Sequence, residues 1–247
     1  MKTMFYRLGM SLGLVGLLAL SGATRERSRG GTYQGSRGSG SWSSKSSRSR
    51  GQMNRSTSVE TQRGTAQREV ERHYDKNTGK GSYSSQTTGP EGKSVSRQGT
   101  VEKTGEGAYH QEGTITGPQG KTTSVDRTST KNEDGTRSVN TTYTNDQGQT
   151  LNVDKTITKT EDGRSVEGSY QSSSGKSGTI KSQTTKEDGK VITEQSVTNQ
   201  DGKTLNRTVE TTKTDTGVHR DISTTNAEGQ TKERSMDINV STQTVTP

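Results

Sequence analysis

Apolar residues after about position 100 tend to occupy every second position of short segments that lie between regularly spaced glycines. In one such segment Leu151, Val153 and Ile157 share one parity, and polar residues fill the alternate positions. Val166 and Tyr170 share parity in the next segment, and the other segments repeat the arrangement. A period of two is typical of a β-strand with one favoured face. The pattern therefore predicts strands of about 9 to 11 residues.

The glycines between these segments predict the turns. They fall in two alternating series with a repeat of 26 to 28 residues, and they are Gly79, Gly92, Gly107, Gly120, Gly135, Gly148, Gly163, Gly175, Gly189, Gly202, Gly217 and Gly229. Many follow Asn, Pro or Asp at the spacing of a type I turn whose last residue is left-handed, the three-residue hairpin loop with a bulge. We therefore expect an all-β fold, a repetitive antiparallel β-meander of up to 13 strands. This meander should be elongated, with little core and with exposed edges at its two ends.

Composition supports an alternative to this fold. Hydrophobic residues make up only 19% of the 247 residues, and the apolar segment near the N-terminus contains a large share of them. A chain this poor in apolar side chains buries too little surface to offset the ordering entropy of the backbone. A largely disordered repeat chain is the alternative.

The N-terminus has the features of a secretory signal peptide. Lys2 and Arg7 precede a run of 13 mainly apolar residues, 8–20, and small residues at Ser21 and Ala23 suit cleavage after residue 23. Such a run is too short to span a bilayer, which takes about 20 apolar residues. Residues 1–23 are therefore expected to be a signal peptide, and the protein to be exported to the periplasm, the cell surface or the medium. No transmembrane segment is expected beyond the signal, and the chain has no cysteine for disulfides or lipid attachment.

Residues 24–70 differ from the repeats. They are rich in Arg, Ser and Gly, and they carry most of the net charge of +8. Such a segment is expected to be a disordered basic arm, either a plain spacer or a binding segment for anionic polymers such as glycan, lipopolysaccharide or extracellular DNA. The candidate anion-binding residues are Arg25, Arg27, Arg29, Arg37, Arg48, Arg50 and Arg55. Residues 71–247 form the degenerate β-hairpin repeat region.

No catalytic, cofactor or metal site is expected from the sequence. His73, His110 and His219 stand at different distances from their nearest turn glycines, and no zinc-type spacing occurs. The leading interpretation is an exported, non-catalytic structural or surface-interaction protein, with no small-molecule substrate. The alternative is a binding protein that holds anionic polymers or cell-envelope components with the 24–70 arm and uses the repeats as a spacer. Self-association through sheet edges or the apolar face is a further expectation.

Overall fold

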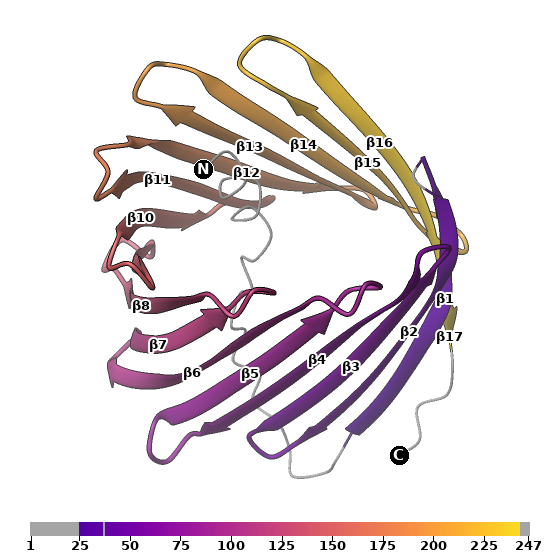
Figure 1. Ribbon diagram of the computed structural model, residues 1–247, viewed down its shortest axis with the longest axis horizontal. Helices are drawn as coiled ribbons and strands as arrows, with labels where there is room; N and C mark the ends of the chain where they lie inside the picture. Colours follow the sequence, from indigo (N-terminus) through magenta and orange to yellow (C-terminus); the bar gives the residue numbers. More distant parts are fainter. Residues whose placement is uncertain (1–24, 37, 243–247) are drawn as a thin grey trace.

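The fold is an all-β, antiparallel barrel, seen in a computed structural model that describes residues 25–36 and 38–242 (Figure 1). The predicted signal peptide lies outside the described residues. The described residues form no helix that is long and apolar enough to cross a membrane. The strands are β1 (Arg25–Gly35), β2 (Gly38–Ser49), β3 (Gln52–Thr61), β4 (Gly64–Asp75), β5 (Lys80–Thr88), β6 (Ser94–Gly105), β7 (Ala108–Thr116), β8 (Thr122–Lys131), β9 (Arg137–Asn145), β10 (Thr150–Lys159), β11 (Gly163–Ser172), β12 (Ser177–Glu187), β13 (Lys190–Asn199), β14 (Thr204–Lys213), β15 (Gly217–Thr225), β16 (Thr231–Asn239) and β17 (Ser241–Thr242).

Each strand pairs with the next one in the sequence, and the last strands pair with the first. Tyr33 of β1 lies opposite Ile238 of β16, and Gly30 of β1 lies opposite Ser241 of β17, which continues the line of β16. This seam is the shortest long-range ladder of the wall, because β1 pairs with β16 only over Tyr33–Gly35 and with β17 only over Arg29–Gly30. The indigo β1 and yellow β16 therefore lie side by side in Figure 1 although they come from opposite ends of the chain.

Closure corrects the predicted shape. The expected repeating antiparallel strands are present, but the chain does not form an elongated meander of up to 13 strands with two free ends. Sixteen long strands curl until the first meets the last. The reason is the sheet's right-handed twist, which a long meander accumulates with every strand until its edges can pair. Closure pairs edge strands that would otherwise be open to self-association.

The barrel is wide. Following the paired residues once around the wall returns to β1 about 20 residues further along. For sixteen strands at the usual spacing, this offset implies a strand tilt of about 40° and a backbone radius of about 15 Å. Among the described residues, strands contact only their ladder neighbours, so opposite walls stay apart. Wall side chains are too short to fill a barrel of this width, and its centre is a lumen.

From β5 onward, the turns at one end of the barrel match the predicted loop, whereas the β1–β2 and β3–β4 hairpins at that end are tighter. In the hairpin between β9 and β10, the Gly148 amide donates to the Asn145 carbonyl over 3.0 Å, and Gly148 has a φ of 75°. The glycines that repeat this conformation at the same end are Gly92, Gly120, Gly175, Gly202 and Gly229. The other end differs from the prediction, because several of its hairpins use tighter two-residue loops. Gly163, for example, is the first residue of β11, and Glu161 and Asp162 alone make the turn.

One set of alternate residues faces the lumen in every long strand. In β10, the backbone N–H and C=O of Val153 point toward β9 and not toward β11. The hydrogen bonds of the flanking turn set this pattern, because hydrogen-bonded pairs alternate along an antiparallel ladder. With the right-handed coiling of barrel strands, this bonding pattern directs Val153 and its ladder neighbours toward the barrel axis. All six buried side chains recorded among the described residues belong to this lumen-facing set, and they are Ser44, Val139, Thr141, Val153, Val166 and Tyr170.

The lumen-facing set also holds the apolar residues. Among strand residues that the structure describes, Ala108 and Ile192 are the only aliphatic or aromatic side chains on the outer set. The outer wall of the described strands is otherwise made of Ser, Thr, Asn, Gln, His, Gly and charged residues. The predicted polar and weakly apolar faces are therefore present, but closure turns the apolar face inward, where it is not available as a flat surface for self-association.

The sequence assigns residues 24–70 to a disordered arm, but the described residues of this segment form strands β1, β2 and β3 and the first part of β4 in the same wall. The physical reason is that their ladders are as continuous as those of the repeats: β1 and β2 pair from Arg25–Arg48 to Gly35–Gly38. Inward positions here carry Arg, Ser and Gly where the repeats carry Val and Ile. The arm and the repeats are therefore one structural unit, and the predicted disorder does not hold for the described residues.

Candidate functional site

Carboxylates of the strands lie on the outside of the barrel, and the other Asp and Glu of the described residues lie in turns at its two mouths. Every Asp and Glu in the described strands belongs to the outer set, beginning with Glu26, which pairs with Ser47, and ending with Asp237, which pairs with His219. The complete set is Glu26, Glu60, Glu69, Glu71, Asp75, Glu102, Glu112, Asp126, Asp154, Glu167, Glu187, Glu194, Glu210, Asp221, Glu233 and Asp237.

Basic side chains lie mainly on the inside. Every arginine of the described strands faces the lumen, and they are Arg25, Arg27, Arg29, Arg48, Arg55, Arg68, Arg72, Arg97, Arg127, Arg137, Arg164, Arg207, Arg220 and Arg234. Most strand lysines join them. The outward exceptions are Lys45, Lys80, Lys181 and Lys190, and three of these form ion pairs with outer carboxylates. The barrel wall therefore separates charge, with a basic lumen and an acidic exterior.

The candidate arginines of the predicted arm gather in one part of the lumen. Arg25 lies directly opposite Arg48 across the β1–β2 ladder, and Arg55 of β3 lies opposite Ser46. The Arg55 Nε donates to the Ser44 Oγ over 3.1 Å. Arg27 and Arg29 follow Arg25 on the same face of β1. Like charges that face each other across a ladder are destabilising unless an anion lies between them.

Two candidate arginines do not join this group. Arg50 lies in the turn between β2 and β3, at a mouth of the barrel rather than on its wall. Arg37 lies outside the described residues. The structure therefore brings together five of the seven sequence-predicted residues and adds Arg68 and Arg72 of β4, whose ladder partners on β3 are Thr57 and Met53.

Water reaches the lumen-facing arginines of this region. Arg25, Arg27, Arg29, Arg55 and Arg68 are exposed although they point toward the axis. In a packed interior these side chains would be buried, whereas no described side chain falls below 2% exposure. The guanidinium groups are therefore accessible from the lumen, and guanidinium binds phosphate and carboxylate in a bidentate manner.

The opposite part of the lumen is more enclosed. Burial lowers the pKa of the Arg127 guanidinium, and nearby Arg137 lowers it further. Burial also lowers the pKa of the Lys155 ammonium, with repulsion from Arg127 as the second cause. Burial raises the pKa of the Tyr143 hydroxyl, which is opposed by attraction to Arg127 and Arg97. This wall holds cations that lack compensating carboxylates on their own face, so it favours an anion.

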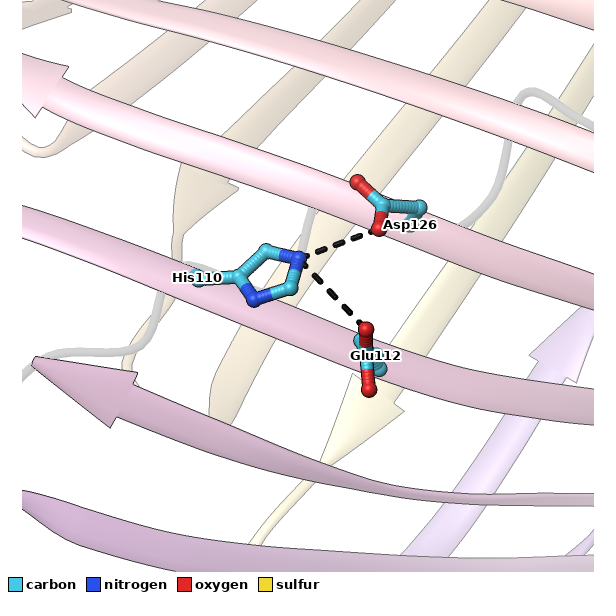
Figure 2. A group of neighbouring side chains, drawn as sticks. All are labelled: His110, Glu112 and Asp126. Carbon is cyan, nitrogen blue, oxygen red and sulfur yellow. Dashed lines mark hydrogen bonds and ion pairs between the residues drawn. The ribbon is translucent and has the colours of Figure 1, made fainter. Parts of the chain in front are cut away.

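The histidines lie on the outer wall beside carboxylates. Figure 2 shows His110 of β7 between Glu112 of the same strand and Asp126 of β8. The His110 Nε2 lies 3.0 Å from Asp126 Oδ2 and 3.9 Å from Glu112 Oε1. Their ligand atoms are close enough to share a divalent cation, but the hydrogen bond from His110 to Asp126 already joins β7 to β8 without one. We therefore assign the cluster to pairing of β7 with β8.

His219 of β15 has a similar environment on the outer wall. Its Nδ1 is hydrogen-bonded to Asp237 of β16, and its Nε2 lies 3.1 Å from Asp221 Oδ2. The hydrogen bond to Asp237 raises the pKa of His219, and attraction to Asp221 adds to the increase. The hydrogen bond to Asp126 likewise raises the pKa of His110.

These pKa shifts predict a loss of stability as pH rises. A raised folded-state pKa adds stability that is complete below the ordinary histidine pKa of about 6.5 and is lost as pH rises through the raised value. The melting temperature should therefore fall between pH 6 and pH 8, by a change worth less than about 1 kcal/mol for the partly exposed His110. Circular dichroism melts across this range measure it. The variant that carries both His110→Gln and His219→Gln should melt at the same temperature throughout this pH range. If its melting temperature falls with pH as steeply as that of the native chain, the assignment is wrong.

No protein-family model matches the sequence, and no curated protein matches it. We therefore infer function from the geometry of the barrel.

Sequence reasoning missed the basic residues of the repeats because the outer carboxylates cancel them in the net charge. A parity count finds them: Arg127 has the parity of Val125 in β8, and Lys155 that of Val153 in β10. The signal was therefore present in the sequence as a coincidence of basic and apolar positions.

Proposed function

We propose that the protein is an exported, non-catalytic binding protein that holds anionic ligands inside its lumen. One observation supports the proposal above all: strand carboxylates face outward, and strand arginines face inward. Separation of this kind produces a positive potential in an enclosed space, which attracts and retains anions. The proposed ligands are the anionic polymers expected from the sequence, but the binding surface is the wall of the barrel rather than a flexible arm.

A non-catalytic role is supported by what the lumen wall contains. The described strands direct no Asp, Glu or His toward the axis, and these are the side chains that most often serve as general acids and bases. The proposed export depends on the signal peptide expected at residues 1–23. The predicted structural or surface-interaction role is the second candidate, and the repetitive Ser- and Thr-rich outer wall favours it.

Binding to low-molecular-weight heparin, lipopolysaccharide and DNA tests the proposal. We compare the full chain with a lumen variant in which Arg25, Arg27, Arg29, Arg48 and Arg55 are changed to Gln. The matched control changes the outer lysines Lys45, Lys80, Lys181 and Lys190 to Gln. The lumen variant should lose at least about tenfold in affinity, and its log–log dependence on salt should become shallower by several charges. Equal effects of the two sets of changes contradict a lumen site.

A further inference from the structure

One mouth of the barrel carries a partial ring of lysines over β6 to β14. Each occupies the last lumen-facing position before a turn at the same end, and they are Lys103, Lys131, Lys159, Lys186 and Lys213. Four of them share one backbone environment, in which the lysine amide donates to a carbonyl in the preceding turn at this mouth. The acceptors are Gly79, Gly107, Asp162 and Gly189, for Lys103, Lys131, Lys186 and Lys213 respectively. Neighbouring lysines are two strands apart, about 10 Å.

The ammonium groups of this ring are available to a ligand. All five lysines are exposed, and no ion pair within 4.0 Å joins any of them to a carboxylate of the described chain. Lys131 lies opposite Arg137, and Lys159 lies opposite Arg164, so like charges face each other across two ladders. An anionic group at this mouth relieves both repulsions.

Near the other mouth, each strand from β7 to β14 has at least one aliphatic or aromatic side chain at the first or second lumen-facing position from the turn. These residues are Ile115, Val125, Tyr143, Leu151, Tyr170, Ile180, Val197 and Leu205, and the positions closest to the turns on β8, β9, β11, β12 and β13 are Thr123, Asn145, Ser172, Gly178 and Asn199. Tyr143 pairs with Leu151, and Val197 pairs with Leu205. Leu205 remains 37% exposed. This apolar belt covers part of the wall and is open to the lumen.

We propose that the lumen binds an anionic amphiphile, with its headgroup among the lysines of the ring and its hydrocarbon chain against the apolar belt. This inference rests on the proposed function and specifies its ligand. A linear polyanion uses the cations but leaves the belt in water, whereas a hydrocarbon chain removes apolar surface from water at both partners. Burial contributes about 0.8 kcal/mol for each CH₂, which corresponds to roughly fourfold in affinity.

Calorimetric titration of the full chain with alkyl phosphates below their micellar concentrations tests the proposal. Hexyl, octyl, decyl and dodecyl phosphate share one headgroup and differ only in chain length. Lys213 and Leu205 are eight residues apart on β14, roughly 26 Å along the strand, so the hexyl and octyl chains end short of the belt and should bind alike. Affinity should rise by roughly threefold to fourfold for each further CH₂ in the chains that are long enough to lie against the belt. Dodecyltrimethylammonium, with the same tail and a cationic head, should bind at least about a hundredfold more weakly than dodecyl phosphate because the lumen repels it.

Variants separate the head site from the tail site. Changing the five lysines of the ring to Gln should weaken dodecyl phosphate and inorganic phosphate alike, by at least about tenfold. Leu205→Asn should reduce the dodecyl phosphate affinity and leave inorganic phosphate unchanged, and its partial exposure keeps the variant folded. The outer-lysine control should change neither affinity.

The outcomes distinguish this inference from the proposed function. If affinity is independent of chain length while heparin or phosphate still binds through lumen cations, the amphiphile is excluded and an anion-binding lumen remains. If the trimethylammonium and phosphate amphiphiles bind equally, the lysine ring has no role and the inference is wrong. If no anion binds in a manner that depends on lumen residues, both proposals fail.

Discussion

Val166→Asp is expected to lower the free energy of unfolding by about 2 to 4 kcal/mol. Val166 lies on the lumen face of β11, is only 4% exposed and faces Ile157 across the ladder. A carboxylate at this buried position loses most of its hydration, and its two ladder partners, Ile157 and Ser182, offer it one hydroxyl and no cation. Chemical denaturation monitored by circular dichroism measures the loss.

Gln171→Asp is the matched control for this substitution. Gln171 lies on the outer face of the same strand, is exposed and pairs with Asn152 and Ser177, neither of which is charged. The same new carboxylate should change stability by less than about 0.5 kcal/mol there. Equal losses at both positions contradict the assignment of faces.

Gly178→Val is expected to cost about 1 to 3 kcal/mol because an aromatic ring covers this glycine. Gly178 of β12 pairs with Tyr170 of β11, and a Cβ atom at residue 178 would lie 2.1 Å from the Thr198 carbonyl oxygen and 2.7 Å from the Tyr170 Cε1. A ring that lies over a glycine on the neighbouring strand shields backbone that has no side chain of its own. The wall repeats the arrangement where Tyr74 covers Gly81.

The coupling between Tyr170 and Gly178 is measurable in a double-mutant cycle. In a Tyr170→Ala background, Gly178→Val should cost at least about 1 kcal/mol less than in the native chain, because the ring that it displaces is absent. Thr179→Val, on the exposed outer face of the next residue, should change stability by less than about 0.5 kcal/mol. Additive effects of the Tyr170 and Gly178 changes mean that the ring does not cover the glycine.

The strands and many turns of the repeats could be predicted from the sequence, because each depends on local chemistry. Parity in β10 and β11 identifies the favoured face, and the left-handed conformation of Gly148 follows from the Asn145–Gly148 turn. Closure could not be predicted in this way. A period of two assigns residues to faces but does not say how strongly the sheet curves, and the seam joins Tyr33 to Ile238, residues that no local pattern relates.

The first strands were missed because their lumen positions carry charge in place of apolar groups. In β1 the inward residues begin Arg25, Arg27, Arg29, an alternation that resembles a flexible polyelectrolyte when only composition is considered. For the same reason, only part of the candidate site could be predicted. The arginines were singled out for their charge, but their grouping with Arg68 and Arg72 depends on the register of β3 with β4.

The closed wall is the central claim, and a cysteine pair across the seam tests it most directly. Gln34 of β1 and Asp237 of β16 are ladder partners on the outer face, so Gln34→Cys with Asp237→Cys should form an intramolecular disulfide in the folded monomer under mild oxidation. The control pairs Gln34→Cys with Asp126→Cys, which lies on β8 and shares no ladder with β1. We expect rapid cross-linking of the first pair and none of the second, as measured by non-reducing electrophoresis and peptide mapping. A folded chain in which neither pair cross-links has open ends, and that result contradicts the barrel and its lumen.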